Sequence, residues 1–357
     1  MNNNDEVISV TNLRKRFDLE AGFFARLGRY VNAVNGVSFS IGRNETYGLV
    51  GESGCGKTTT ARLLVRMYEA DEGEILFRSR AGNTEDVGKL KGAGLKRYRE
   101  RVKYVFQDPA RSLNPRMTVY EILTSGARWS EEKQKKGKEA SLREEAAAIL
   151  EEVGLSGADL ERRPAEFSGG QRQRISIARG LIMKPELLIC DEVVSALDVS
   201  IQGQILNLLL DLRSRRKASG HDISFLFIAH DLKVASYFCD RIGVMYRGEI
   251  MEEAPAENIW KNCLHPYTEL LFSCINRGDS IPPDPPGQRG AGEIAASGPP
   301  GPPSSVQKKG SHVSPRETSG CSFAPRCHYA EERCFREKPE LRAAEDGHLV
   351  KCWKSDS

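Results

Sequence analysis

The sequence has no apolar run long enough to cross a lipid bilayer, because a membrane-spanning helix needs about 20 consecutive, mostly apolar residues. Its first residues, Met1-Asn2-Asn3-Asn4-Asp5-Glu6, also lack the basic start and apolar core of a secretory leader. We therefore expect a cytoplasmic protein, and any role at a membrane would require separate membrane subunits. The 357 residues have room for one large domain and an appendage.

A strong charge of either sign is missing as well. The formal net charge is only +3, which is too small to argue for a nucleic-acid partner. The one local exception is the basic stretch 89–103, which holds seven lysines and arginines. Such a stretch could contact nucleic acid or lipid, but we interpret it as a solvated connector.

A glycine-rich turn is the first positive signal. An apolar, strand-like stretch, residues 47–50, runs into the turn, and helix-favouring residues follow from Ala61. Glycines let backbone N–H groups converge on phosphate oxygens, and a helix N-terminus adds its positive dipole end. Lys57 would lie between the β- and γ-phosphates of ATP, and Thr58 would ligate Mg²⁺. The residues expected to bind nucleotide here are Gly51, Glu52, Ser53, Gly54, Cys55, Gly56, Lys57, Thr58 and Thr59.

A second helix start of the same kind follows Phe167. The run Ser168-Gly169-Gly170-Gln171 opens a helical pattern, with Ser168 as its N-cap candidate. Alone, a Ser-Gly-Gly run is ordinary loop chemistry. Here the run lies between the glycine-rich turn and the acidic pair Asp191-Glu192. This order along the chain favours a second phosphate-binding helix start over an ordinary loop.

Three strand-like segments end in polar side chains. The apolar run 187–190 precedes Asp191 and Glu192, the run 224–229 precedes His230, and the run 104–106 precedes Gln107. Asp191 would hold the Mg²⁺ shell, and Glu192 would polarise the attacking water as general base. His230 would sense the γ-phosphate, and Gln107 would bind metal or water. A single strand-end His or Gln is usually a surface residue, but their combined order predicts one shared site.

In these motifs the chain resembles the ATPase subunits of ABC importers of the oligopeptide/dipeptide and nickel group, over residues 6 to 275. The resemblance implies an α/β P-loop NTPase (RecA-like) core with antiparallel β and α-helical subdomains. It assigns residues 6–276 to the nucleotide-binding domain and residues 112–165, approximately, to the helical subdomain. Beyond the general ABC motifs it is carried by Gln107-Asp108-Pro109-Ala110-Arg111-Ser112-Leu113-Asn114-Pro115-Arg116-Met117, Ser195-Ala196-Leu197-Asp198-Val199-Ser200 and His265-Pro266-Tyr267-Thr268-Glu269-Leu270-Leu271.

The same resemblance implies a head-to-tail pair of ATPase domains. Each ATP would lie between the phosphate loop of one chain and Ser168 to Gln171 of the other, and Asp198 would lie at their interface. Adenine would stack on Phe17, with Phe23, Phe24 and Tyr30 as rivals.

Other subunits are also implied by the resemblance. We expect a second ATPase subunit that is a paralogue, two membrane permease subunits and an extracytoplasmic substrate-binding protein. The chain itself would be peripheral, on the cytoplasmic face of the membrane.

Two residues depart from the family pattern. Phe167 stands where Leu is usual, a swap at an apolar packing position, and Val193 stands where Pro is usual, which loosens the turn toward Ser195. Glu192 is present, so we expect an active hydrolytic site.

The C-terminal part of the chain has a different composition. Residues 277–320 are rich in Pro, Gly and Ser and are interpreted as a disordered or polyproline linker. Four cysteines follow within residues 321–353, where a disulfide would not suit a cytosolic protein. Their spacing resembles the 4Fe-4S extension of some peptide-importer ATPases. Zn²⁺ and unliganded thiols are the alternatives, and His328 could replace one thiolate. The four are Cys321, Cys327, Cys334 and Cys352.

The other cysteines have a simpler interpretation. We assign Cys55 to packing of the phosphate loop rather than to nucleophilic chemistry. Cys190, Cys239, Cys263 and Cys274 are interpreted as buried or incidental thiols.

The predicted function is therefore ATP hydrolysis that drives uptake of oligopeptides or dipeptides. One alternative keeps this motor but changes the cargo to nickel or another small solute, or reverses the direction. A soluble ABC ATPase of DNA repair or translation is disfavoured. Repair members insert a long coiled coil and translation members usually carry two such domains, and neither feature is present.

Overall fold

The computed structural model describes residues 5–18, 30–127, 139–275, 319–344 and 347–356. Twelve strands lie in this part of the chain, in two sheets. They are β1 (Glu6–Asp18), β2 (Tyr30–Gly42), β3 (Thr46–Val50), β4 (Glu72–Arg78), β5 (Thr84–Asp86), β6 (Val102–Val105), β7 (Leu187–Asp191), β8 (Ser224–Ala229), β9 (Arg241–Tyr246), β10 (Glu249–Pro255), β11 (Arg342–Ala343) and β12 (Leu349–Val350).

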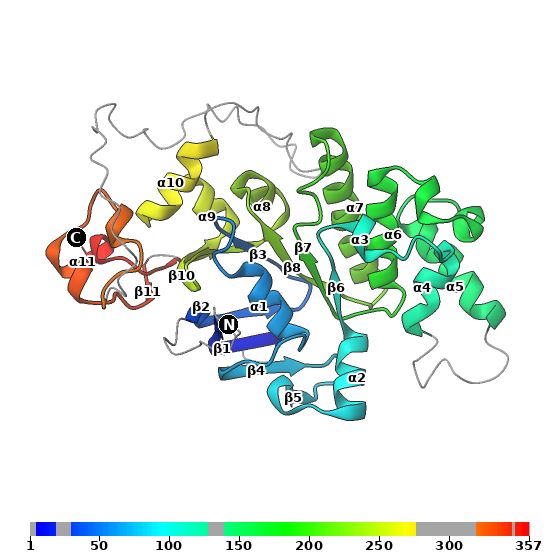
Figure 1. Ribbon diagram of the computed structural model, residues 1–357, viewed down its shortest axis with the longest axis horizontal. Coiled ribbons are helices and arrows are strands. Elements are labelled where there is room, and N and C mark those ends of the chain that lie inside the picture. Colours follow the sequence, from blue (N-terminus) through cyan, green and yellow to red (C-terminus); the bar gives the residue numbers. More distant parts are fainter. Residues whose placement is uncertain (1–4, 19–29, 128–138, 276–318, 345–346, 357) are drawn as a thin grey trace, which may run out of the picture.

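The helices are distributed along the whole of the described chain (Figure 1). The α-helices are α1 (Lys57–Leu64), α2 (Gly92–Arg101), α3 (Pro109–Ser112), α4 (Val119–Ala127), α5 (Glu139–Glu152), α6 (Gly169–Leu181), α7 (Val199–Ala218), α8 (Leu232–Phe238), α9 (Ala256–Lys261), α10 (Pro266–Ile275) and α11 (Glu332–Arg336). Short 3₁₀ turns are η1 (Val87–Lys89), η2 (Gly157–Glu161), η3 (Pro164–Glu166), η4 (Ala324–Arg326) and η5 (Trp353–Asp356).

The larger sheet has the order β11-β12-β10-β9-β3-β8-β7-β6. Strands β6, β7, β8, β3 and β9 are parallel to one another, and every residue of β3, β7 and β8 is buried. Strands covered on both faces need continuous apolar runs, which explains why these three segments show no alternation. The smaller sheet, β2-β1-β4-β5, is antiparallel, so the predicted combination of a parallel core and an antiparallel subdomain is confirmed.

Helices α3 to α6 lie together at one end of the molecule (Figure 1), and α4 and α5 fall within residues 112–165, the range predicted for a helical subdomain. None of the helices in the described ranges is both long and apolar enough to span a membrane. The basic stretch 89–103 is not a solvated connector, because it forms α2 and enters the sheet as β6. Arg99 there donates to the backbone oxygens of Val65 and Arg66, at 3.2 and 2.7 Å.

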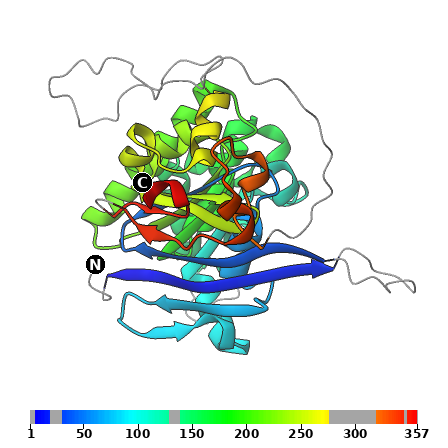
Figure 2. The ribbon, with the colours of Figure 1, turned by 90° about the vertical axis from the view of Figure 1, so that its left-hand side faces the viewer.

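The C-terminal cysteine segment, residues 319–356 without the undescribed 345–346, is built onto the core sheet. Strand β12 pairs antiparallel with β10, and β11 pairs with β12. Cys321, Phe323, Ala324 and Val350 are buried, the first three among the core side chains of the main body. Figure 2 shows this segment, in orange and red, lying against the rest of the protein. The predicted linker, residues 277–320, lies almost entirely outside the described residues and stays a prediction.

Substitution Leu226→Ala should destabilise the protein by about 2–5 kcal/mol, because Leu226 is fully buried in the middle strand β8 and its loss leaves a cavity. Urea unfolding measures this change. Met67→Ala is the control, since Met67 is 45 % exposed and should cost less than about 0.5 kcal/mol. Equal unfolding midpoints for the two variants would contradict the central place of β8.

Candidate active site

Four parallel strands end at the same edge of the core sheet, and the predicted site residues follow those ends. β3 ends at Val50, directly before the phosphate loop, and β7 ends at Asp191. β8 ends one residue before His230, and β6 ends two residues before Gln107. Carboxyl ends of parallel strands are where ligands bind in such sheets. The fold therefore gathers residues that lie far apart in the sequence.

The phosphate loop, residues 51–58, requires glycine at two positions of close approach. Gly56 has a φ of +113°, and a Cβ on it would lie 2.1 Å from the backbone oxygen of Ala33. A Cβ on Gly51 would lie 2.1 Å from the backbone oxygen of Met245. Because such contacts are impossible, larger residues would push the loop away from its neighbours β2 and β9.

Lys57 begins α1 and points back into the loop. Its Nζ donates to the backbone oxygens of Gly51 at 2.7 Å and Glu52 at 3.0 Å, and its side chain is buried. Ser53 and Gly54 form the exposed tip of the loop. The ammonium group is thus held beneath a turn whose outer backbone faces solvent.

Asp191 connects the end of β7 to the phosphate loop. It accepts a hydrogen bond from Thr58 Oγ1 at 3.0 Å and another from the hydroxyl of Tyr104. Burial, reinforced by the charge of Asp191, raises the pKa of Tyr104 well above its usual range, so this hydroxyl stays a donor. Thr59 follows on the same helical turn. A cavity of about 460 Å³, lined by Asp191 and Gln107, opens beside them.

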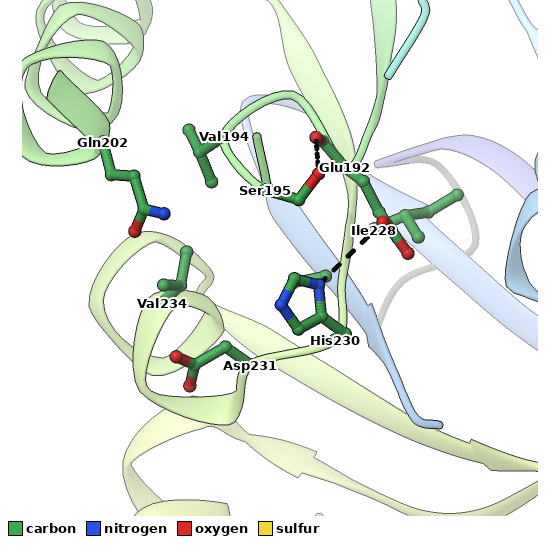
Figure 3. Close-up of a pocket in the computed structure, with 9 residues that line it drawn as sticks. Glu192, Val194, Ser195, Gln202, Ile228, His230, Asp231 and Val234 are labelled. Carbon is green, nitrogen blue, oxygen red and sulfur yellow. Dashed lines mark hydrogen bonds and ion pairs between the residues drawn. The ribbon is translucent and has the colours of Figure 1, made fainter. Parts of the chain in front are cut away.

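The Glu192 side chain lies close to two other predicted site residues, Gln107 and His230. Its Oε2 accepts from Gln107 Nε2 at 2.8 Å and lies 3.9 Å from His230 Nδ1. Ser195 Oγ donates to the backbone oxygen of Glu192 at 2.9 Å (Figure 3). Glu192 has a φ of +48°, a conformation uncommon for a residue with a side chain. The strand therefore turns sharply there and directs the carboxylate toward Gln107 and His230.

Ser168 caps α6 as predicted. Its Oγ accepts from the backbone N–H of Gln171 at 3.3 Å, and Gln171 Oε1 accepts from the N–H of Ser168 at 2.9 Å, which makes a capping box. Gly169 is the first helical residue, and a Cβ on Gly170 would lie 2.8 Å from a side-chain carbon of α7. Phe167 is 3 % exposed, so its expected role as an apolar packing residue is confirmed.

The Ser168 turn does not join the phosphate loop of its own chain. Helix α6 packs against α3, α4, α5 and β6, whereas α1 packs against β2, β7 and β8, and the two helices occupy different parts of Figure 1. No hydrogen bond or ion pair connects the two loops in the described ranges. Asp198, which precedes α7, is exposed and makes no side-chain cap.

The candidate adenine platform, Phe17, lies near the end of β1. Its ring is 36 % exposed and packs edge-on against Tyr68, with 5.3 Å between ring centroids. The rival Tyr30 is also exposed, beneath the guanidinium of Arg16. Phe23 and Phe24 lie outside the described residues. Phe17 and Tyr30 are thus both exposed enough for an adenine base to stack on them.

Known proteins resemble this chain over almost its whole length. A family model described as ABC transporter matches residues 34–195. The oligopeptide transport ATP-binding protein AppF of Bacillus subtilis (strain 168) is 38 % identical, over 98 % of this chain and 98 % of that protein. The chain belongs to the ATP-binding proteins of ABC transporters.

Further relatives of this ABC ATPase agree. The oligopeptide transport ATP-binding protein OppF of Bacillus subtilis (strain 168) is 45 % identical, over 76 % of this chain and 83 % of that protein. Among solved structures, MJ1267, an ATP-binding cassette of an ABC transporter in its ADP conformation, is 27 % identical with a TM-score of 0.58, over 75 % of this chain and 98 % of that one. A second family model, described as Oligopeptide/dipeptide transporter, C-terminal region, matches residues 251–334.

The four cysteines of the C-terminal segment line one cavity of about 600 Å³ in this ABC ATPase, together with His328. Burial raises the pKa of three of these thiols, that of Cys352 to about 11, and also those of Cys321 and Cys327. Within the described residues, no three His, Cys, Asp or Glu side chains gather closely enough to hold a single metal ion.

The remaining cysteines behave as packing residues. Cys55 is 6 % exposed inside the phosphate loop, and burial raises the pKa of its thiol. Burial likewise raises the pKa of the Cys190 and Cys239 thiols, and that of Cys263 to about 12. Thiols in this state are poor nucleophiles. The side chain of Cys274 lies outside the described residues.

Three site residues escaped sequence reasoning. Tyr104 stands in the segment that predicted Gln107, but nothing in the sequence assigned its hydroxyl to Asp191. Tyr267 accepts from the N–H of Glu52 at 2.9 Å; its only signal was the family-like segment that begins at His265. Arg326 binds the Glu52 side chain across 274 residues, and no local pattern predicts such a contact.

Substitution Glu192→Gln should leave ATP binding intact and lower the hydrolysis rate at least about 100-fold, because an amide cannot take a proton from the attacking water. Steady-state phosphate release and titration with a fluorescent ATP analogue separate the two effects. Glu257→Gln is the matched control, since Glu257 is exposed and pairs with Lys261 on α9. Unchanged turnover in Glu192→Gln would remove Glu192 from the role of base.

Proposed function

We propose that this chain is the ATP-hydrolysing subunit of an importer that takes up oligopeptides or dipeptides. The observation that carries this proposal is the match of residues 251–334 to the C-terminal region of oligopeptide/dipeptide transporters, on a chain whose sheet edge also carries an ATP site. Relatives named for oligopeptide transport over almost the full length support the same cargo.

The phosphate loop is proposed to bind the triphosphate. Its exposed backbone N–H groups and the first turn of α1 offer donors and a positive dipole end to the phosphates. Lys57, freed from the loop carbonyls, would turn to the β- and γ-phosphates. Thr58 and Asp191 are in direct contact and supply the hard oxygen donors that Mg²⁺ prefers. When bound, the ion would neutralise charge that develops on the phosphates.

Hydrolysis is assigned to the residues around Glu192. Its carboxylate would accept a proton from the water that attacks the γ-phosphorus, and Gln107, hydrogen-bonded to it, would orient that water. His230, which follows the neighbouring parallel strand β8 at the same sheet edge, would donate a hydrogen bond to the γ-phosphate. Strands β8, β7 and β6, which lead to these residues, follow β3 in that order on one side of the strand that precedes the phosphate loop, which supports this assignment.

A complete site is proposed to need a second ATPase domain. Within the described residues, no hydrogen bond joins Ser168 or the α6 N-terminus to the phosphate loop of the same chain. We therefore propose that their donors serve a nucleotide held by the partner. The exposed Asp198 would lie at this interface. We expect the partner to be a paralogue, as in the peptide-importer group.

The assembly is proposed to include two membrane permease subunits and an extracytoplasmic substrate-binding protein, with this chain on the cytoplasmic face of the membrane. Peptide choice would belong to those other subunits. The alternative cargo is nickel or another small solute, and the less favoured alternative is a soluble ABC ATPase of DNA repair or translation.

We also infer that the four C-terminal cysteines hold a 4Fe-4S cluster. The four cysteines line one common cavity of about 600 Å³, and four cysteine thiolates are the usual ligands of such a cluster. Bound iron would hold the thiols as thiolates, and Cys321, Cys327, Cys334 and Cys352 would be its ligands.

Reconstitution with the permease subunits and the substrate-binding protein encoded nearest this gene tests the cargo. We expect peptides to stimulate ATP hydrolysis severalfold, and nickel to have no effect. Lys57→Ala in the same complex should abolish both ATP binding and stimulation. Stimulation by nickel alone, or none by any member of a peptide panel, would contradict peptide uptake.

Anaerobic purification with iron and zinc analysis tests the cluster. We expect a brown protein with broad absorbance near 400 nm and about four iron atoms per chain, and loss of colour in Cys334→Ser. Cys263→Ser, outside the C-terminal segment, should keep the iron. A colourless protein with one zinc per chain would contradict the proposal of a 4Fe-4S cluster.

A further inference from the structure

The C-terminal segment reaches into the phosphate loop through a single side chain. Arg326, at the end of η4, donates to both carboxylate oxygens of Glu52, Nη1 to Oε2 and Nη2 to Oε1, each at 2.8 Å. Two parallel bonds of this kind fix the planes of both groups. The hydrogen bonds from Arg326 lower the pKa of Glu52, which keeps the carboxylate charged.

Packing holds the Arg326 guanidinium in place. It lies 5.6 Å from the ring centre of Tyr246 and 5.8 Å from that of Phe323. These rings belong to a cluster with Tyr267, in which centroids are 4.6 to 5.4 Å apart. Both charged side chains are 40 % exposed, so the pair adds little to global stability. The surrounding aromatic rings therefore fix the orientation of the Arg326–Glu52 pair.

The backbone of Glu52 is fixed from two other directions. Its N–H donates to the hydroxyl of Tyr267 at 2.9 Å, and its carbonyl accepts from Lys57 Nζ at 3.0 Å. Tyr267 is itself anchored, because its N–H donates to Nδ1 of the buried His265 at 3.0 Å. The N–H of Cys55 also donates to the Glu52 carbonyl, at 3.2 Å. Among these four partners of Glu52, Arg326 is the one that comes from the C-terminal segment.

Other contacts fasten the C-terminal segment to β10, so that Arg326 has a defined position. Lys351 and Lys338 both pair with Glu249, at 2.8 and 2.5 Å. His348 Nε2 lies 2.6 Å from Oε1 of the fully buried Glu252. Basic groups of the segment thus meet carboxylates of the core at each attachment.

We propose that Arg326 is a positioning residue of the ATP site, through which the C-terminal segment sets ATP affinity. Without Arg326, the Glu52 carboxylate would lose its hydrogen-bonded cation and keep only the weaker influence of Arg247 and Lys57. Its less compensated charge would then repel the triphosphate that the loop must receive. Glu52 would also lose the constraint that keeps its side chain turned away from the loop's exposed face. The proposal rests on ATP binding at the phosphate loop, as given under the proposed function.

The test compares variants of the full-length chain by ATP titration, and by steady-state hydrolysis once each variant is assembled with the partner ATPase subunit and the permease subunits. Arg326→Gln should raise the Kd and KM for ATP about tenfold and leave kcat within about twofold, because Glu192 and its neighbours are untouched. Arg326→Lys should recover part of the affinity, since it keeps the charge but lacks the two-pronged geometry.

A double-mutant comparison isolates the contact. In a Glu52→Gln background, where no carboxylate remains to be neutralised, Arg326→Gln should change the Kd less than about twofold. A merely structural role would predict the same loss in both backgrounds.

Arg333→Gln is the matched control. Arg333 lies in the same segment, stacks on Trp353 and pairs with Glu337, so its loss should leave ATP affinity unchanged. Iron content and unfolding temperature of every variant show whether the segment stays intact. If Arg326→Gln does not fold, Arg326→Lys with and without Glu52→Gln gives the same comparison.

Two results would overturn the proposal: an Arg326→Gln affinity equal to wild type, or a loss that persists undiminished with Glu52→Gln. Failure of the wild-type chain to bind ATP would instead contradict the proposed function.

Discussion

Parallel pairing of β6, β7, β8 and β3 is the constraint on which the rest of the proposed ATP site depends. Neighbouring strands in a sheet lie about 4.8 Å apart, so strands separated by one other strand lie about 10 Å apart. β3 and β7 flank β8 in this way, and a threonine after one strand can touch an aspartate at the end of the other. The hydrogen bond from Thr58 to Asp191, at 3.0 Å, is such a contact. Any slip in register would separate these side chains.

The polar groups at this edge are arranged so that each charge has a partner. Asp191, only 3 % exposed, has the hydroxyls of Thr58 and Tyr104. Glu192 has the amide of Gln107 and the nearby ring of His230. The left-handed backbone of Glu192 costs on the order of 1 kcal/mol. Such a cost is tolerated where a side chain must point in a direction that a regular strand would not allow.

Much of this arrangement could be predicted from sequence. Buried parallel strands show as short apolar runs, and their polar end residues identify the site edge, so the phosphate loop, Asp191 and Glu192 were located without a structure. The basic stretch 89–103 was wrongly interpreted as a solvated connector. Its many charged side chains drew attention away from Tyr98 and Val102, which are buried in the fold. Contacts such as Arg326 to Glu52 were out of reach, since they depend on how distant segments dock and leave no local pattern.

The attachment of the C-terminal segment has a consequence for how the protein is made. Glu52 and Arg326 are separated by 274 positions, and a ribosome adds residues in order. The nascent chain therefore completes its central strands and phosphate loop long before the side chain that holds Glu52 is synthesised. A product that stops short of residue 326 has the phosphate loop without the Arg326 contact to Glu52, so on the proposal above it would bind ATP more weakly than the longer chain.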